Sequence, residues 1–218
     1  MILTRALISY EIAARWQKDG GFRDSYAWHK RIWEAFPGKP EADRDFLTRL
    51  DDTGEGFRLL IQSPEQPTRP DWCPENEWES RPISDAFLSH QQYHFSLLAN
   101  PTRKRVTRDE QGNRKKNGRR EPIVTREDLI AWLTRKAAQH GFEIDTSTLK
   151  TIPRPRQAFT KKEKSTETRH HGTHTATEFS GILKVTAPTL FQQSVRTGIG
   201  SAKAFGFGML CLSPLPKP

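Results

Sequence analysis

The chain has 218 residues, with 35 Lys and Arg against 26 Asp and Glu, so its formal net charge is +9 at pH 7. This length is sufficient for one large domain or two small ones, each with its own core. Two cysteines far apart in the sequence predict neither a disulfide framework nor a zinc site. No run approaches the roughly 18 apolar residues of a membrane span, and the first residues lack the layout of a signal peptide. We therefore expect a cytoplasmic protein without a membrane partner.

The positive charge is concentrated in two segments. Residues 103–120 carry nine basic and two acidic side chains, and residues 150–171 carry seven and two. The rest of the chain is left with 19 basic and 22 acidic residues, because 35 − 16 = 19 and 26 − 4 = 22. Two basic segments on a mildly acidic body indicate a surface for a polyanion such as nucleic acid. The alternative is that both segments are solvated loops.

The first half of the chain predicts an incomplete α+β unit. The elements expected there are a strand, a helix and three further strands, at residues 2–10, 24–36, 44–50, 56–62 and 84–88. One face of the helix is apolar and predicts a core contact through Trp28, Ile32, Ala35 and Phe36. Five prolines interrupt residues 64–82, so a second helix there must be short, displaced or absent.

The second half predicts the order strand, helix, strand, strand, helix, strand. These elements are expected at residues 93–99, 125–140, 142–151, 177–185, 188–197 and 204–212, with a basic hairpin between the middle strands. This order is that of the ferredoxin-like (RRM-like) βαββαβ unit. We therefore predict an α+β protein of two tandem ferredoxin-like domains, residues 1–88 and 89–218, the first degenerate. Small sheet domains of this shape commonly bind RNA.

A glycine-rich loop, TGIGSAKAFGFGML at residues 197–210, contains four glycines and Lys203. Such loops let a backbone approach a phosphate closely. The spacing matches neither a Walker A loop nor a dinucleotide fingerprint, so we expect no small-molecule nucleotide. The remaining readings are a contact to a nucleic-acid phosphate and a plain turn between the last helix and the last strand.

The predicted helix at 24–36 carries the candidate chemistry. Tyr26 and His29 are three residues apart and therefore neighbours on the helix surface, with Lys30 close by. RNA contains its own nucleophile, the 2′-hydroxyl, so its cleavage needs proton transfer and positive charge but no metal. Histidine can transfer protons near neutral pH. Ordinary packing at the edge of the core is the alternative for this pair.

Two further groups of side chains have less specific patterns. His170, His171 and His174 could bind zinc on a helix, but we expect them in the hairpin and expect no metal. Phe205 and Phe207 could stack on bases if they alternate along the last strand, although core packing is the ordinary role of such residues.

Several separated motifs resemble one family. They are the short first strand, SYAWHK, AFPGKPEADRDFL, LLANP, AWLTRKA and GIGSAKAFGFGML, which together extend over most of the chain. In this combination the sequence resembles the CasE family, the CRISPR repeat endoribonucleases of type I-E systems.

The resemblance implies metal-independent cleavage of a CRISPR precursor at each repeat hairpin by 2′-hydroxyl attack, giving 5′-hydroxyl and 2′,3′-cyclic phosphate ends. It also implies retention of the cut RNA within the Cascade complex, and no cofactor. The family's catalytic histidine and tyrosine correspond to His29 and Tyr26. The RNA contacts that we expect are Lys30, Arg154, Arg156, Lys161, Lys162, Lys164, Arg169, Gly200, Ser201 and Lys203. The alternative is a non-catalytic scaffold that binds an RNA hairpin.

Overall fold

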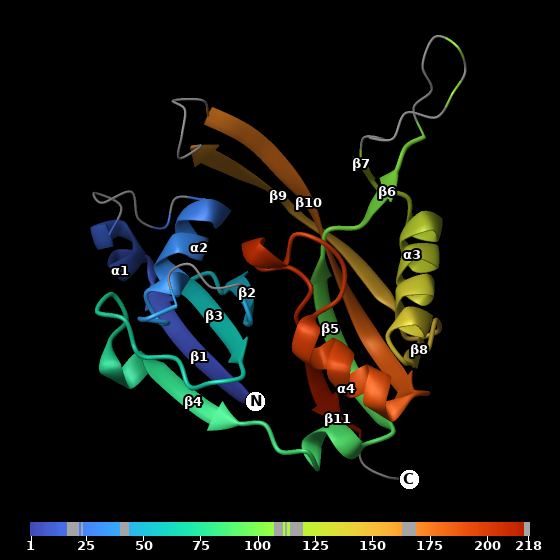
Figure 1. Cartoon of the computed structure of the whole chain (residues 1–218), viewed down its shortest axis with the longest axis horizontal. Coiled ribbons are helices and arrows are strands. Elements are labelled where there is room, and N and C mark those ends of the chain that lie inside the picture. Colours follow the sequence, from blue (N-terminus) through green and yellow to red (C-terminus); the bar gives the residue numbers. More distant parts are fainter. Residues whose placement is uncertain are drawn as a thin grey trace.

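The computed structural model describes residues 1–16, 22, 24–39, 44–106, 111, 113, 120–162 and 169–215, with residues 158–162 and 169–171 described by their backbone alone. Two antiparallel sheets organise the chain into halves that lie side by side (Figure 1). No helix among the described residues is long and apolar enough to cross a membrane.

The first sheet has the strand order β2-β3-β1-β4, and each neighbouring pair is antiparallel. This is the strand order of a ferredoxin-like unit. Its elements are β1 (Ile2–Ser9), α1 (Tyr10–Arg15), α2 (Ser25–Trp33), β2 (Leu47–Asp52), β3 (Gly56–Ser63), the 3₁₀ turn η2 (Glu75–Glu77) and β4 (Trp78–Pro82).

The second sheet repeats this order as β11-β5-β10-β8, with β9 also paired to β10. The tandem ferredoxin-like fold is therefore confirmed, whereas the boundary between residues 88 and 89 stays a prediction. The elements from this boundary onward are η3 (Phe87–Ser89), β5 (Gln92–Ala99), β6 (Thr102–Lys104), β7 (Arg120–Pro122), α3 (Arg126–Gln139), β8 (Phe142–Ile144), β9 (Lys150–Lys162), β10 (Arg169–Val185), α4 (Pro188–Thr197), η4 (Lys203–Phe205) and β11 (Leu210–Pro214).

Helix α2 starts at a well-defined cap. The Asp24 carboxylate accepts hydrogen bonds from the backbone N–H groups of Tyr26 and Ala27, at 3.0 and 2.8 Å. The apolar face predicted from the sequence is buried, with Trp28 6% and Ile32 4% exposed. The helix ends at Trp33 rather than at residue 36, because the next three N–H groups bond three residues back, as in a 3₁₀ turn.

The proline-rich segment after β3 forms no α-helix in its described residues. It instead packs Trp72 and Cys73 into the first core. The Trp72 indole N–H donates to the Arg31 carbonyl at 3.3 Å, and the Thr68 N–H donates to the Ala35 carbonyl at 2.9 Å. An extended segment thus occupies the chain position of the second helix and supports the end of α2.

Two strands predicted from the sequence, at residues 84–88 and 142–151, differ from those in the structure. The strand expected at 84–88 is wrong, because Ser84 caps the turn η3 through the Phe87 N–H at 3.2 Å and the pairing strand is β4. The strand expected at 142–151 is divided into β8 and β9. The Asp145 carboxylate accepts the Ser147 N–H at 3.0 Å and forms the turn that divides them.

The last strand is shorter than predicted and begins at Leu210. Gly206 and Gly208 have φ values of +86° and +87°, outside the strand region, so residues 204–209 form the end of the 3₁₀ turn η4 and an irregular segment after it. The basic hairpin between the middle strands is confirmed: β9 and β10 pair along their length and extend from the second half past α2 (Figure 1).

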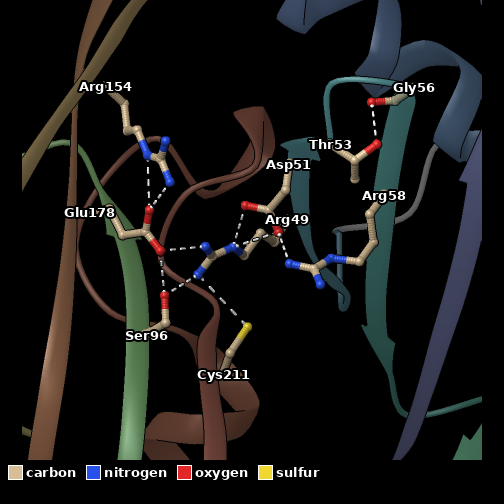
Figure 2. A network of polar contacts seen from close by, with 9 residues as sticks. All are labelled: Arg49, Asp51, Thr53, Gly56, Arg58, Ser96, Arg154, Glu178 and Cys211. Atoms are coloured by element: carbon tan, nitrogen blue, oxygen red, sulfur yellow. Dashed lines mark hydrogen bonds and ion pairs between the residues drawn. The ribbon is translucent and has the colours of Figure 1, made fainter. Parts of the chain in front are cut away.

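The two halves are joined by a buried guanidinium, that of Arg49 on β2 (Figure 2). It donates to Asp51 on its own strand at 2.9 Å, to Ser96 on β5 at 2.7 Å and to Glu178 on β10 at 2.8 Å. Glu178 in turn pairs with Arg154 on β9. Partial burial alone would raise the pKa of Glu178, but hydrogen bonds from these arginines and Ser96 lower it to about 2.

We expect Arg49→Ala to lower the free energy of unfolding by about 3–5 kcal/mol, because it leaves the carboxylates of this network partly buried without their central cation. Arg5→Ala removes an exposed pair with Glu79 and should cost about 1 kcal/mol or less. Urea unfolding of both variants measures the difference. Equal losses in the two variants would show that Arg49 does not hold the halves together.

Candidate active site

Helix α2 presents three of the predicted site residues together. The ring centroids of Tyr26 and His29 are 6.4 Å apart, and the Lys30 ammonium lies 5.0 Å from the centroid of the Tyr26 ring. Tyr26 and His29 are partly exposed and Lys30 is exposed. A phenol, an imidazole and a cation are therefore neighbours on one accessible part of the helix.

The imidazole of His29 is held by two contacts. The Trp33 indole Nε1 donates to His29 Nε2 at 3.1 Å. Because an indole N–H can only donate, Nε2 accepts and the neutral ring carries its proton on Nδ1. Burial, and then the positive charge of Arg44, lower the pKa of His29, while a hydrogen bond to the Ala204 backbone raises it. The balance lowers the pKa, so His29 is mostly neutral near neutral pH.

His29 lines a cavity of about 360 Å³ formed by both halves of the chain. The first half contributes α2, β2 and β3, and the second contributes Arg156 and Gln157 from β9 and residues 204–206 from the glycine-rich loop. Both β9 and η4 contact α2. The site therefore requires the two halves to be docked.

Phe205 and Phe207 do not alternate along a strand, as the sequence suggested, because both precede β11. Phe207 is fully buried in a small cluster with Leu98. Phe205 lies in the turn η4, with its ring centroid 6.3 Å from that of His29 and 4.8 Å from that of His174. It therefore forms part of the wall around the imidazole.

The glycine-rich loop is folded back on itself. The Ile199 N–H donates to the Gly208 carbonyl at 2.8 Å, and the Gly208 N–H donates to the Leu98 carbonyl at 2.8 Å. The Lys203 ammonium donates to the Thr197 carbonyl at 2.8 Å, and the Ser201 hydroxyl donates to the Asn100 carbonyl at 3.3 Å. These bonds hold the loop in one position beside α2, with Gly200 at its start.

The hairpin residues that the sequence predicted as RNA contacts do not all lie at the site. Arg154 pairs with Glu178 and belongs to the network between the halves. Arg156 is exposed and lines the cavity of His29. The backbones of Lys161 and Lys162 pair with those of His170 and Arg169 near the hairpin end, and Lys164 lies outside the described residues. Their assignment as RNA contacts stays a prediction.

Sequence reasoning missed Arg44, which lies just before β2. Its guanidinium Nη1 donates to the Lys203 carbonyl at 2.6 Å and so joins the first half to the glycine-rich loop. Arg44 stands in a run of alternating charges, EADRD, and no periodicity distinguishes it from its neighbours. Only the fold shows that this arginine reaches the loop.

The fold and the site define a class: a tandem ferredoxin-like protein with an imidazole between its halves and a basic hairpin beside it. The family model described as CRISPR associated protein matches residues 1–214, and the chain belongs to this family.

Individual relatives cover most of the chain. It is 30% identical over 201 residues to the CRISPR system Cascade subunit CasE of Escherichia coli (strain K12), covering 88% of this chain and 94% of that protein. It is 23% identical over 198 residues to the CRISPR-associated endoribonuclease Cse3 of Thermus thermophilus, covering 87% and 90%. A structure of CRISPR endoribonuclease Cse3 bound to a 19-nucleotide RNA has the same fold, with a TM-score of 0.72 at 23% identity, covering 98% and 100%.

We expect Gly208→Ala to destabilise the protein more than Gly206→Ala. Both glycines have positive φ, which costs an alanine about 1–2 kcal/mol. A methyl group at Gly208 would also lie 2.6 Å from the Ile199 carbonyl oxygen, whereas at Gly206 the nearest atom is 3.9 Å away. Urea unfolding of the two variants tests this, and equal losses of stability would contradict the packing of the loop.

Proposed function

We propose that this chain is an endoribonuclease that cuts CRISPR precursor RNA at its repeat hairpins and retains the product within Cascade. One observation carries the proposal: His29 lines a cavity between the halves, bordered by the glycine-rich loop and by Arg156 at the base of the basic hairpin. Membership of the CRISPR-associated family, and relatives named as a Cascade subunit and an endoribonuclease, support it. Its substrate is a transcript, so we expect the protein in the cytoplasm.

The arrangement suits attack by the 2′-hydroxyl that RNA itself carries. A neutral His29 is fit to accept the proton of this hydroxyl as its oxygen bonds to phosphorus. The bond from phosphorus to the 5′-oxygen then breaks, and the leaving oxygen takes up a proton. The products are a 2′,3′-cyclic phosphate and a 5′-hydroxyl, and no metal ion is needed in this step.

RNA must change the contacts of His29 before it reacts. In the free protein Nε2 accepts from Trp33 and the ring also bonds to the Ala204 backbone. One ring nitrogen has to be released to meet the 2′-hydroxyl. The centroid of the Tyr26 ring lies 6.4 Å from that of the His29 ring, and the Tyr26 hydroxyl would orient the reacting group.

The hairpin formed by β9 and β10 is a suitable support for an RNA stem. A-form RNA has a deep, narrow major groove and is held mainly through phosphates and 2′-hydroxyls. Arg156 would hold the stem end near His29, and Lys161, Lys162, Lys164 and Arg169 stand further along the hairpin in sequence. Lys30, Gly200, Ser201 and Lys203 complete the expected contacts around the cut.

We expect purified protein to cut a labelled CRISPR repeat hairpin in the presence of EDTA, and His29→Ala to lose about 10²–10⁴-fold in rate. Binding of the hairpin by His29→Ala, measured by gel shift, should persist, because the hairpin and loop are untouched.

The control is a hairpin with a 2′-deoxynucleotide at the cut, which should bind and remain intact. Loss of cleavage in EDTA, or full activity of His29→Ala, would overturn this mechanism. Hairpin binding with no cleavage by the unmodified protein would instead identify a non-catalytic scaffold.

Tyr26→Phe should slow cutting less than His29→Ala, because removal of the phenol hydroxyl leaves the proton acceptor in place. Single-turnover rates at saturating protein compare the two variants. A Tyr26→Phe rate equal to or below that of His29→Ala would contradict this order and show that the phenol is at least as important to the rate as the imidazole.

A further inference from the structure

Arg44 is a half-buried cation close to the candidate site. Among the described residues, no Asp or Glu forms an ion pair with Arg44. It donates a hydrogen bond to the Lys203 carbonyl at 2.6 Å, and its guanidinium carbon lies 5.8 Å from the centroid of the Phe46 ring. A partly desolvated charge without an opposite charge is costly, so its retention indicates a ligand that supplies the anion.

The surroundings of Arg44 are positively charged. It lines a cavity of about 800 Å³ between the halves, together with Lys203 and Arg196. Of the residues that the structure describes, the acidic side chain lining this cavity is that of Asp45, and its carboxylate already binds the Lys39 ammonium at 3.2 Å. An anion that entered here would therefore meet the charges of Arg44 and Lys203.

This cavity is adjacent to that of His29. Ala204 lines both, and the turn η4 that contains it lies between Arg44, which binds the Lys203 carbonyl, and His29, whose ring faces Phe205. The charge of Arg44 also lowers the pKa of both His29 and Lys203, in each case after the larger effect of burial. Arg44 is thus electrostatically close to the group that transfers the proton.

We propose that Arg44 is a further catalytic residue, whose guanidinium binds the non-bridging oxygens of the phosphate that is cleaved. The inference rests on the proposed function. Arginine has five N–H donors in a planar fork, and the bond to Lys203 leaves donors for two phosphate oxygens. Its charge would offset the negative charge that grows on these oxygens as the 2′-oxygen attacks. Arg44 itself exchanges no proton.

The competing role is structural, because the same guanidinium fixes the glycine-rich loop. Arg44→Gln removes the charge and keeps an amide N–H donor on a shorter side chain, so a pH profile is needed to separate the two roles. Arg5→Ala is the control, since Arg5 is an exposed arginine on β1 that pairs with Glu79 and lines neither cavity.

The test measures single-turnover cleavage of the repeat hairpin and binding of its 2′-deoxy analogue. We expect Arg44→Gln to lose about 10²–10³-fold in rate with little change in Kd, and Arg5→Ala to cut normally. Arg44→Lys keeps the charge but loses the fork, and should lose at least about tenfold.

The pH dependence adds a readout that loop support alone would not give. Removing the charge should raise the pKa of His29 and move the corresponding limb of the rate profile to higher pH. The other charged groups facing the imidazole, Asp24 and Arg156 in its cavity and Lys30 on its helix, stay unchanged in this comparison.

Two outcomes overturn the inference alone: normal cleavage by Arg44→Gln, or a loss confined to Kd with an unchanged rate at saturation. Absence of cleavage by the unmodified protein would instead overturn the proposed function. If Arg44→Gln does not fold, as judged by circular dichroism, Arg44→Lys decides, and a rate equal to that of the unmodified protein refutes the inference.

Discussion

The buried Arg49 guanidinium connects two units that otherwise have separate cores. It bonds to Asp51 in one sheet and to Ser96 and Glu178 in the other. A buried ion pair often adds little net stability compared with apolar packing, but its directional bonds tolerate few alternative arrangements. We therefore regard this network as the constraint that sets the position of one sheet relative to the other.

That position matters because neither half contains a complete site. The first half supplies His29 and Arg44, and the second supplies η4 and Arg156. A small rotation between the sheets would separate the imidazole from Phe205 while leaving both cores intact. The proline-rich segment also fixes the position of α2, since Trp72 and Thr68 bind backbone carbonyls at its C-terminal end. Helix α2 is thus fixed by contacts that lie far from it in the sequence.

Local patterns in the sequence predicted local structure well. The apolar period of the helix predicted at 24–36 placed Tyr26 and His29 on an accessible surface, and the element order predicted two ferredoxin-like units, the first degenerate. Arg49 could not be found in this way, because nothing in the strand LTRLDD marks its arginine as buried and Glu178 lies 129 residues away. The last strand was overestimated because alternating Phe205 and Phe207 imitate a strand, whereas the glycines beside them have positive φ.

The charges along the chain also have two different uses that composition cannot separate. Arg154 and Arg156 are two residues apart on β9 and equally basic, yet Glu178 neutralises the first and the second lines the cavity of His29. Arg49 and Arg44 differ in the same way: Glu178 pairs with Arg49, whereas Arg44 lines the neighbouring cavity. Arg49 and Arg154 have carboxylate partners and join the halves, whereas no Asp or Glu in the described part of the chain pairs with Arg44 or Arg156. A polyanion would therefore be attracted to these two unneutralised arginines, which line cavities where the two halves meet.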